Sequence, residues 1–193
     1  MIGHLARVTE AQLSVLQADP SMTPAFLYGG ARAGAEPAVP GLFARLLGAR
    51  AHPPAPARAV LAESDDLDLD KAWHGLHYLL TGTAWEGEFP ASFLVSGGMP
   101  LGEEDVGYGP ARAFAPEEVR AIADFLDGMD ETALRARYVP AELAEAEIYP
   151  DVIWTRDEEA ETNWEYLLDA FTRSRAFVRE AADRGLALLA FLN

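Results

Sequence analysis

The sequence predicts a single α+β domain, and three observations support this prediction. Apolar runs of strand length stand near both ends of the chain, at 2–8 and 186–192. Between them, apolar residues recur at helical spacing, most clearly over 68–81 and 158–184. A length of 193 residues is typical of one domain, since domains commonly have about 100–200 residues. We therefore expect a small mixed sheet that includes both terminal strands and packs against several helices.

The first third of the chain passes from a strand to a helix and then to a loop. If the two terminal strands share a sheet, Leu5 and Leu189 should both be buried. Thr9 and Gln12 have the spacing of a capping box, in which each side chain bonds a free amide, so a helix is expected to begin here. Glycine and proline are frequent over 29–58, and we interpret this stretch as a Gly/Pro-rich loop region within the same domain.

The segment 68–81 predicts an amphipathic helix that Gly82 ends. At about 100° per residue its apolar side chains gather on one face, with His77 at the edge of that face. His74 lies further round, and Lys71 lies on the opposite, outer side. The helix therefore has a core face, a polar edge and an outer face.

The second half of the chain contains several further helix signals. Helices are expected to start at Pro116, where proline takes the first helical position, at Asp130, which can cap a turn, and at Pro140. The long helical pattern over 158–184 is followed by Gly185, a typical stop signal. The last apolar run then predicts a buried strand.

The composition excludes several kinds of site. The chain has no cysteine, so it has no disulfide, no thiol nucleophile and no thiolate metal site. Its first residues lack the basic and apolar regions of a signal peptide. No apolar run approaches the roughly 20 residues that a membrane span needs. We therefore expect a cytoplasmic protein.

The charge of the chain is strongly negative. With 31 acidic residues against 15 basic ones, the formal net charge is -16. Such a field repels phosphate backbones, which argues against nucleic acids and anionic membranes as partners. It is compatible with a basic protein partner or a cationic ligand, and it also keeps a protein soluble.

The polar edge of the 68–81 helix has three possible interpretations. In the first, His74 and His77 bind a metal, since zinc accepts histidine and carboxylate ligands. Asp70 or an acid from 103–105 would complete that site. In the second, His77 is a general acid or base that Asp70 orients. In the third, His77 is a buried residue bonded to a backbone carbonyl. We favour the third interpretation. We also expect no metal and no cofactor, because two histidines and distant carboxylates offer too few ligands for a metal ion.

A second group of candidates stands in the segment GEEDVGYGPAR at 102–112. Its glycines and proline predict a tight bend that exposes backbone amides, Tyr108 offers a flat face, and Arg112 offers a fork for a carboxylate. The segment is either a ligand loop or a structural turn in which Arg112 pairs with an acid, and we favour the turn. It lacks the third glycine of a dinucleotide fingerprint. The candidate ligand-binding residues of the chain are His74, Glu104, Tyr108 and Arg112.

The chain contains a single lysine, Lys71, beside two aspartates. Either Asp68 or Asp70 can cap the helix, which explains the aspartates simply. Lys71 lies opposite the apolar face, so its own helix does not bury it. We hypothesise a structural tether between Lys71 and the acids of 103–105, because an ammonium group on a flexible stem can be shared among several carboxylates.

Four stretches carry a resemblance to a known family: MIGHLARV at the start, LDLDKAWHGLHYLLTG (67–82), EDVGYGPARAFAPEEV (104–119) and AEIYPDV (146–152). In these stretches the sequence resembles the YfbM-like family, an uncharacterised bacterial family of domains of unknown function. The resemblance covers most of the chain and is least clear around 29–58. It implies an α+β fold. It implies no activity, because the family has no established catalytic residues to carry over.

Two classes of function remain after these observations. The first is a protein-interaction domain, similar to an inhibitor, an immunity protein or an adaptor, whose acidic surface meets a basic partner. The alternative is a small-molecule-binding domain or an enzyme with a cleft between the 68–81 helix and the 103–112 loop, using His77 as acid or base. Convergence of the candidate residues on one accessible pocket would favour the alternative.

Overall fold

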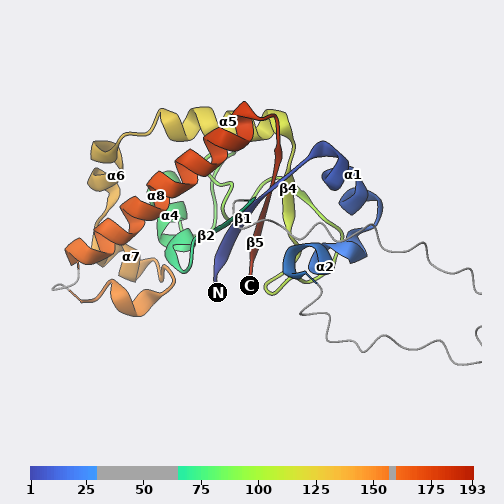
Figure 1. Cartoon of the computed structure of the whole chain (residues 1–193). Coiled ribbons are helices and arrows are strands. Elements are labelled where there is room, and N and C mark those ends of the chain that lie inside the picture. The colour runs from blue at the N-terminus through green and yellow to red at the C-terminus, as the bar shows by residue number, and fades with distance from the viewer. Residues whose placement is uncertain (30–64, 157–159) are drawn as a thin grey trace, which may run out of the picture.

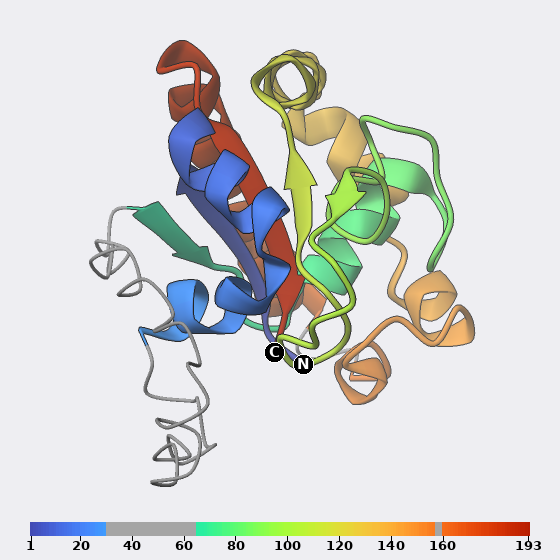
Figure 2. The same ribbon diagram turned by 90° about the vertical axis from the view of Figure 1, so that its right-hand side faces the viewer.

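The computed structural model describes residues 1–29, 65–156 and 160–193, which form an antiparallel sheet with helices on both faces (Figures 1 and 2). The loop predicted over 29–58 lies, apart from Gly29, outside the described residues. The described residues form a sheet of five strands in the order β2-β1-β5-β4-β3. The strands are β1 Gly3–Val8, β2 Asp66–Asp68, β3 Met99–Pro100, β4 Arg112–Phe114 and β5 Ala187–Leu192. The α+β class is confirmed, but every pairing is antiparallel, where the sequence predicted a mixed sheet.

The two terminal strands lie side by side in the middle of the sheet, as the apolar ends of the sequence predicted. β1 and β5 pair along their whole length, and Leu5 and Leu189 are both fully buried. Two further hydrogen bonds extend the pairing, from the amide of Ile2 to the carbonyl of Asn193 (2.8 Å) and from the amide of Asn193 to the carbonyl of Ile2 (2.9 Å). Both termini therefore lie together at one end of the sheet (Figures 1 and 2).

Helices cover the two faces of the sheet unequally (Figure 1). Because side chains alternate along a strand, β1 directs Leu5 to one face and Ala6 to the other. α4, α5 and α8 build a large core on the Leu5 face, and α1 and α2 close a smaller core on the Ala6 face. No helix among the described residues is long and apolar enough to cross a membrane. The helices are α1 Glu10–Ala18, η1 Pro20–Met22, α2 Thr23–Tyr28, α4 Ala72–Thr81, α5 Pro116–Asp127, α6 Glu131–Arg137, α7 Pro140–Glu145, η3 Asp151–Ile153 and α8 Ala160–Asp183.

Local signals in the sequence set the ends of several helices. At the start of α1, Thr9 and Gln12 form the predicted capping box, with the amide of Thr9 donating to Oε1 of Gln12 (2.8 Å) and the amide of Gln12 to Oγ1 of Thr9 (3.2 Å). Asp130 caps α6 by accepting an amide of its first turn at 2.7 Å. Gly82 and Gly185 follow α4 and α8 with positive φ of 78° and 64°.

Helix α4 begins later than the sequence predicted. Residues 66–68 pair with β1 as strand β2, so the helix starts at Ala72 and not at 68. Neither predicted aspartate caps it. Asp68 accepts the amide of Asp70 at 2.6 Å, and Asp70 has a positive φ of 48°, so both belong to the turn between β2 and α4. The residue at the cap position is Lys71, whose side chain makes no capping bond.

Candidate functional site

The predicted site residues fall into two groups in the structure. His74 and His77 lie on α4 inside the large core, and both are 0% exposed. Tyr108 and Arg112 line a pocket at the edge of the β4–β5 pair. None of the residues that line this pocket comes from α4, so the cleft predicted between that helix and the 103–112 loop is not the arrangement found.

His74 is held by hydrogen bonds on both ring nitrogens. Its Nε2 lies 2.7 Å from the carbonyl of Ala84, and its Nδ1 accepts the amide of Tyr149 at 2.9 Å. These partners assign the neutral tautomer with the proton on Nε2. The ring also packs against Trp73 and Trp85, with centroids 4.8 Å and 4.2 Å away. Burial lowers the pKa of His74, which keeps it neutral and makes it a structural link between α4 and two flanking segments.

Asp70 does not orient His77 as the second interpretation expected, and no hydrogen bond joins it to either histidine among the described residues. Asp70 instead accepts the hydroxyl of Tyr166 at 3.0 Å. The same hydroxyl accepts the amide of Lys71 at 3.0 Å, so Tyr166 joins α8 to the turn before α4. Asp70 is therefore committed to the fold and does not orient a catalytic histidine.

His77 is enclosed by the protein. Its Nε2 lies 3.5 Å from Oγ1 of Thr81, and the described residues give its Nδ1 no hydrogen-bond partner. Burial lowers the pKa of His77 to about 4, and the neighbouring His74 and Arg112 act in the same direction. The structural interpretation expected His77 to be buried, as it is, and bonded to a backbone carbonyl. The backbone of Glu86 acts on the His77 ring and opposes the lowering of its pKa, and His74 makes a carbonyl contact of this kind at 2.7 Å. His77 is neutral at pH 7 and has no access to solvent, which removes it from direct contact with a substrate in this conformation.

The residues do not fit the metal-binding interpretation. Among the described parts of the chain, no group of three His, Asp or Glu side chains could hold a metal ion. A metal bound by His74 would break its bond to Ala84 or to Tyr149. That no metal binds in solution stays a prediction.

Arg112 is fixed by backbone carbonyls. Its Nη1 donates to the carbonyls of Phe93 (3.1 Å) and Gly97 (3.0 Å). Its Nη2 donates to the carbonyl of Leu94 (2.8 Å). The prediction of an ion pair between Arg112 and an acid is therefore wrong for the described residues. The carbonyls of the 93–97 turn bond the guanidinium in place of a carboxylate. Burial lowers the pKa of Arg112 to about 10, so the group stays charged at pH 7.

The turn that carries Tyr108 is fixed from within. Oδ1 of Asp105 accepts the amides of Gly107 (2.7 Å) and Gly109 (3.0 Å), and the amide of Tyr108 donates to the carbonyl of Leu192 on β5 (3.1 Å). These bonds use the amides that the sequence predicted to be exposed. Gly107 has φ of 144°, and a Cβ there would lie 2.8 Å from the carbonyl oxygen of Leu192, so glycine is required for this close approach. The ring of Tyr108, in contrast, is 60% exposed.

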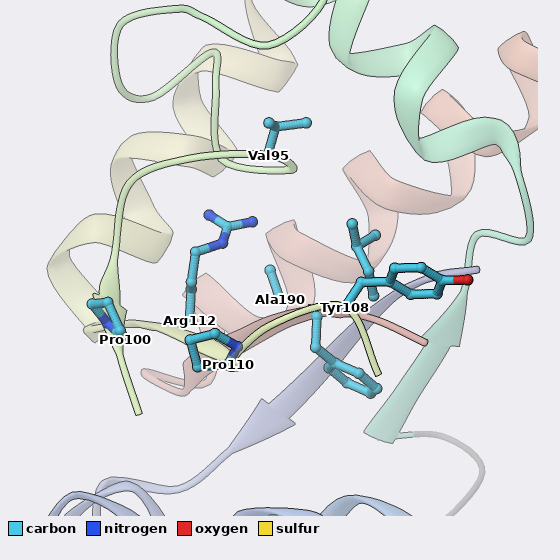
Figure 3. Close-up of a pocket in the computed structure, with 8 residues that line it drawn as sticks. Val95, Pro100, Tyr108, Pro110, Arg112 and Ala190 are labelled. Atoms are coloured by element: carbon cyan, nitrogen blue, oxygen red, sulfur yellow. The ribbon is translucent and has the colours of Figure 1, made fainter. Parts of the chain in front are cut away.

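The pocket between these two elements has a volume of about 210 Å³. In Figure 3 the Arg112 side chain extends from β4 toward Val95, and Pro100 and Pro110 flank its base. Tyr108 stands on the other side, beyond Ala190. The full lining is Val95, Pro100, Tyr108, Pro110, Arg112, Ala190, Phe191 and Leu192. The guanidinium is the charged group of this lining, and most of the remaining wall is apolar.

Glu104 and Lys71 do not contribute to the pocket. Both are exposed, and neither lines it. No ion pair within 4.0 Å joins Lys71 to the acids of 103–105 in the part of the chain that the structure describes. Asp105 uses its carboxylate inside its own turn. The predicted tether is therefore not formed.

The apolar wall of the pocket was not among the sequence candidates. Ala190 and Leu192 lie on the same face of β5, and the register places Ala190 opposite Arg112. That alternation was visible in the sequence, but the pairing of β4 with β5 was not. Val95 belongs to a turn without a recognisable period, so no local signal pointed to it.

Comparison with known proteins places the chain in a family. The model of the family described as Domain of unknown function (DUF1877) matches residues 1–191. The chain belongs to this family. The Protein YfbM of Escherichia coli (strain K12) is 34% identical over 106 residues, which span 53% of this chain and 62% of YfbM. The resemblance to the YfbM-like family that the sequence indicated is thereby confirmed.

The fold of the DUF1877 chain is shared with a solved structure. The Crystal Structure of a Protein of Unknown Function YfbM from Escherichia coli aligns with a TM-score of 0.65 at 23% sequence identity, covering 98% of both chains. At this identity the likeness shows the fold. The family is described as a domain of unknown function and the solved protein as one of unknown function, so neither assigns a role to the pocket.

Proposed function

We propose that this DUF1877 protein is a binding domain that receives a small molecule, or the end of a larger one, in the pocket lined by Arg112 and Tyr108. One observation carries the proposal: a charged, largely buried guanidinium borders a surface pocket and is held there by neutral carbonyls. An ionisable group perturbed by burial and placed in a cleft is a recognised sign of a functional site.

The rigidity of the pocket supports a binding role. Three carbonyl bonds fix Arg112, and the bond to Leu192 together with the Asp105 turn fixes the backbone of Tyr108. A site whose groups are already ordered loses less conformational entropy when a ligand binds. The exposed ring of Tyr108 therefore extends from a rigid backbone and can cover a ligand without the loop first becoming ordered.

The size of the pocket limits the ligand. Sites for drug-sized molecules enclose roughly 300–1,000 Å³. A volume of about 210 Å³ is smaller than this range. The pocket therefore suits a compact molecule or one terminal group, and a whole nucleotide would extend far beyond it.

The other predicted functions have less support. A basic protein partner follows from the net charge of -16 and stays a prediction. A catalytic role for His77 would require contact with a substrate, and this side chain is 0% exposed. Contact would need the segments that cover α4 to move.

The proposal is tested by amide NMR with a fragment set of equal numbers of anionic, neutral and cationic compounds. Saturable shifts are expected at the amides of Val95, Tyr108 and Leu192, whichever class binds. The Tyr108→Ala variant should weaken them, and Val152→Ala, at another exposed apolar residue (57%), should not. Absence of saturable shifts, or shifts confined to residues away from the pocket, would contradict the proposal.

A further inference from the structure

We infer that the ligand of this pocket carries a carboxylate on a small apolar body, and that Arg112 binds this carboxylate. The inference rests on the proposed function, because it names the chemical class of ligand for the same site. A free organic acid and the C-terminus of a peptide both offer this chemistry.

The first argument is the number of donors on Arg112. A guanidinium has five N–H donors and no acceptor. Nη1 uses two on Phe93 and Gly97, and Nη2 uses one on Leu94. The Nε–H and the second Nη2–H have no hydrogen-bond partner among the described residues. The side chain is thus held firmly while part of its donor set remains for a ligand.

The second argument is the missing negative charge. Five other arginines of the described chain each have a carboxylate oxygen at 2.7–3.5 Å: Arg7, Arg135, Arg173, Arg179 and Arg184. Arg120, Arg137 and Arg175 have no such ion pair among the described residues, but none of them lines the pocket. Arg112 has none within 4.0 Å among the described residues, although acids outnumber basic residues by 31 to 15 in the chain. Carbonyl dipoles solvate its charge without neutralising it. A carboxylate supplies the countercharge and fits the planar donors of arginine.

The third argument concerns the rest of the ligand. Around Arg112 the wall is formed by side chains without charge, mainly Val95, Pro100, Pro110, Ala190 and Leu192. These surfaces favour a hydrocarbon body, and the ring of Tyr108 can cover it. A single guanidinium balances one negative charge, and His77, whose pKa Arg112 helps to lower, is neutral. The net charge of -16 disfavours a second negative charge, so a monocarboxylate fits better than a phosphate dianion.

The experiment compares matched acids and amides by calorimetry and amide NMR at pH 7. The probes are phenylacetate against phenylacetamide, N-acetylphenylalanine against its C-terminal amide, and inorganic phosphate. We expect an acid to bind about tenfold or more tightly than its amide, the size of effect that hydrogen bonds to a charged group give. Preference between phenylacetate and N-acetylphenylalanine distinguishes a free acid from a peptide terminus, and either result supports the inference.

Two variants locate the effect. Tyr108→Glu introduces a negative charge at an exposed position and should abolish acid binding, whereas Tyr108→Gln, which also removes the ring, should weaken binding but retain the preference for the acid. Arg112→Lys keeps the charge but loses the planar donor set, and it should reduce the acid preference by about tenfold. Its matched control is Arg120→Lys, at an exposed position on α5. The Tyr108 pair remains informative if Arg112→Lys does not fold.

The outcomes separate this inference from the proposed function. Equal binding of acid and amide at the pocket, unchanged in Tyr108→Glu, would reject the carboxylate while leaving the binding pocket in place. Phosphate binding as tightly as the acids would reject the apolar body. If no probe perturbs the pocket and the fragment set also fails, both proposals are wrong.

Discussion

The histidines of α4 and the Arg112 pocket both bury ionisable groups, but they satisfy them differently. His74 bonds through both nitrogens to the backbone and is neutral. Arg112 remains charged, uses three of its five donors on carbonyls and borders a pocket. The first arrangement completes the fold and leaves nothing for a ligand. The second retains binding capacity at the surface, which is the property expected of a functional site.

This difference shows why burial alone does not identify a site. His77 and Arg112 both have a pKa lowered by burial, to about 4 and about 10. For His77 the shift favours the uncharged form, and the group is enclosed. For Arg112 the shift leaves the group charged at pH 7 beside a pocket. The protonation state at pH 7 and the access to solvent therefore distinguish Arg112 from His77.

The largest effect on stability is expected for His74→Ala, which removes the histidine that links α4 to its flanking segments. It leaves the carbonyl of Ala84 and the amide of Tyr149 without their partner and opens a cavity beside Trp73 and Trp85. Each unpaired buried group costs about 1–3 kcal/mol, so we expect a loss of about 3–5 kcal/mol in the free energy of unfolding. Urea denaturation measures it. A loss below about 1 kcal/mol would show that His74 is not the structural link described above.

Acid pH should destabilise the fold through His77. Its pKa falls from 6.5 to about 4 on folding, so between these values the unfolded chain binds a proton that the folded chain does not. Stability should therefore decrease by about 1.4 kcal/mol for each pH unit lowered from 6.5 to 4 through this group. His77→Asn should remove that part of the slope. Equal slopes in the two proteins would contradict the assignment.

His4 should act in the opposite sense and at higher pH. Burial alone would lower its pKa, but Asp66, whose carboxylate lies 3.6 Å away, and Asp68 act in the opposite direction and raise the pKa of His4 overall. The stability that protonated His4 contributes is complete below 6.5 and is lost as pH rises through its raised pKa. Comparison of His77→Asn with the unsubstituted protein below pH 6.5 separates the two histidines.

A smaller effect on stability is expected for Tyr108→Ala, which tests whether this residue serves the pocket and not the fold. The ring is 60% exposed, so the free energy of unfolding should change by less than about 0.5 kcal/mol. The affinity of bound fragments should nevertheless fall, because the ring lines the pocket. Parallel thermal unfolding and fragment titration measure both. A large loss of stability would mean that Tyr108, like His74, has a structural role in the fold.

The smallest effect is expected for Lys71→Gln. The side chain is exposed and has no ion pair within 4.0 Å among the described residues. The free energy of unfolding should change by less than about 0.5 kcal/mol, and a double-mutant cycle with Glu104→Gln should give coupling near zero. Coupling well above the experimental error would restore the tether that the sequence suggested.

The fold could be predicted because its signals are local. Capping at Thr9 and Asp130, the stops at Gly82 and Gly185, and the apolar terminal strands each depend on residues close in sequence. The start of α4 was missed for the opposite reason. Residues 66–68 form a strand because β1, far away in the sequence, pairs with them.

The site could be predicted only as a set of residue types. Arg112 and Tyr108 were recognised because a guanidinium fork and an aromatic face are typical of binding sites. Their partners were not, since the carbonyls of 93–97 and the end of β5 are brought to them by tertiary packing. The helical angle of His74 failed similarly. It placed the ring away from the core face, but the carbonyl of Ala84 and the amide of Tyr149 reach it from other segments.

The central position of the last strand has a consequence for how the chain acquires its fold. β5 separates β1 from β4, so a chain being synthesised has no bridge between the two halves of the sheet until residues 187–192 have emerged. The β1–β5 contacts also join residues at the two extremes of the sequence, which raises the contact order and slows folding. The two halves of this sheet can therefore be joined only once β5 is available to pair with both β1 and β4.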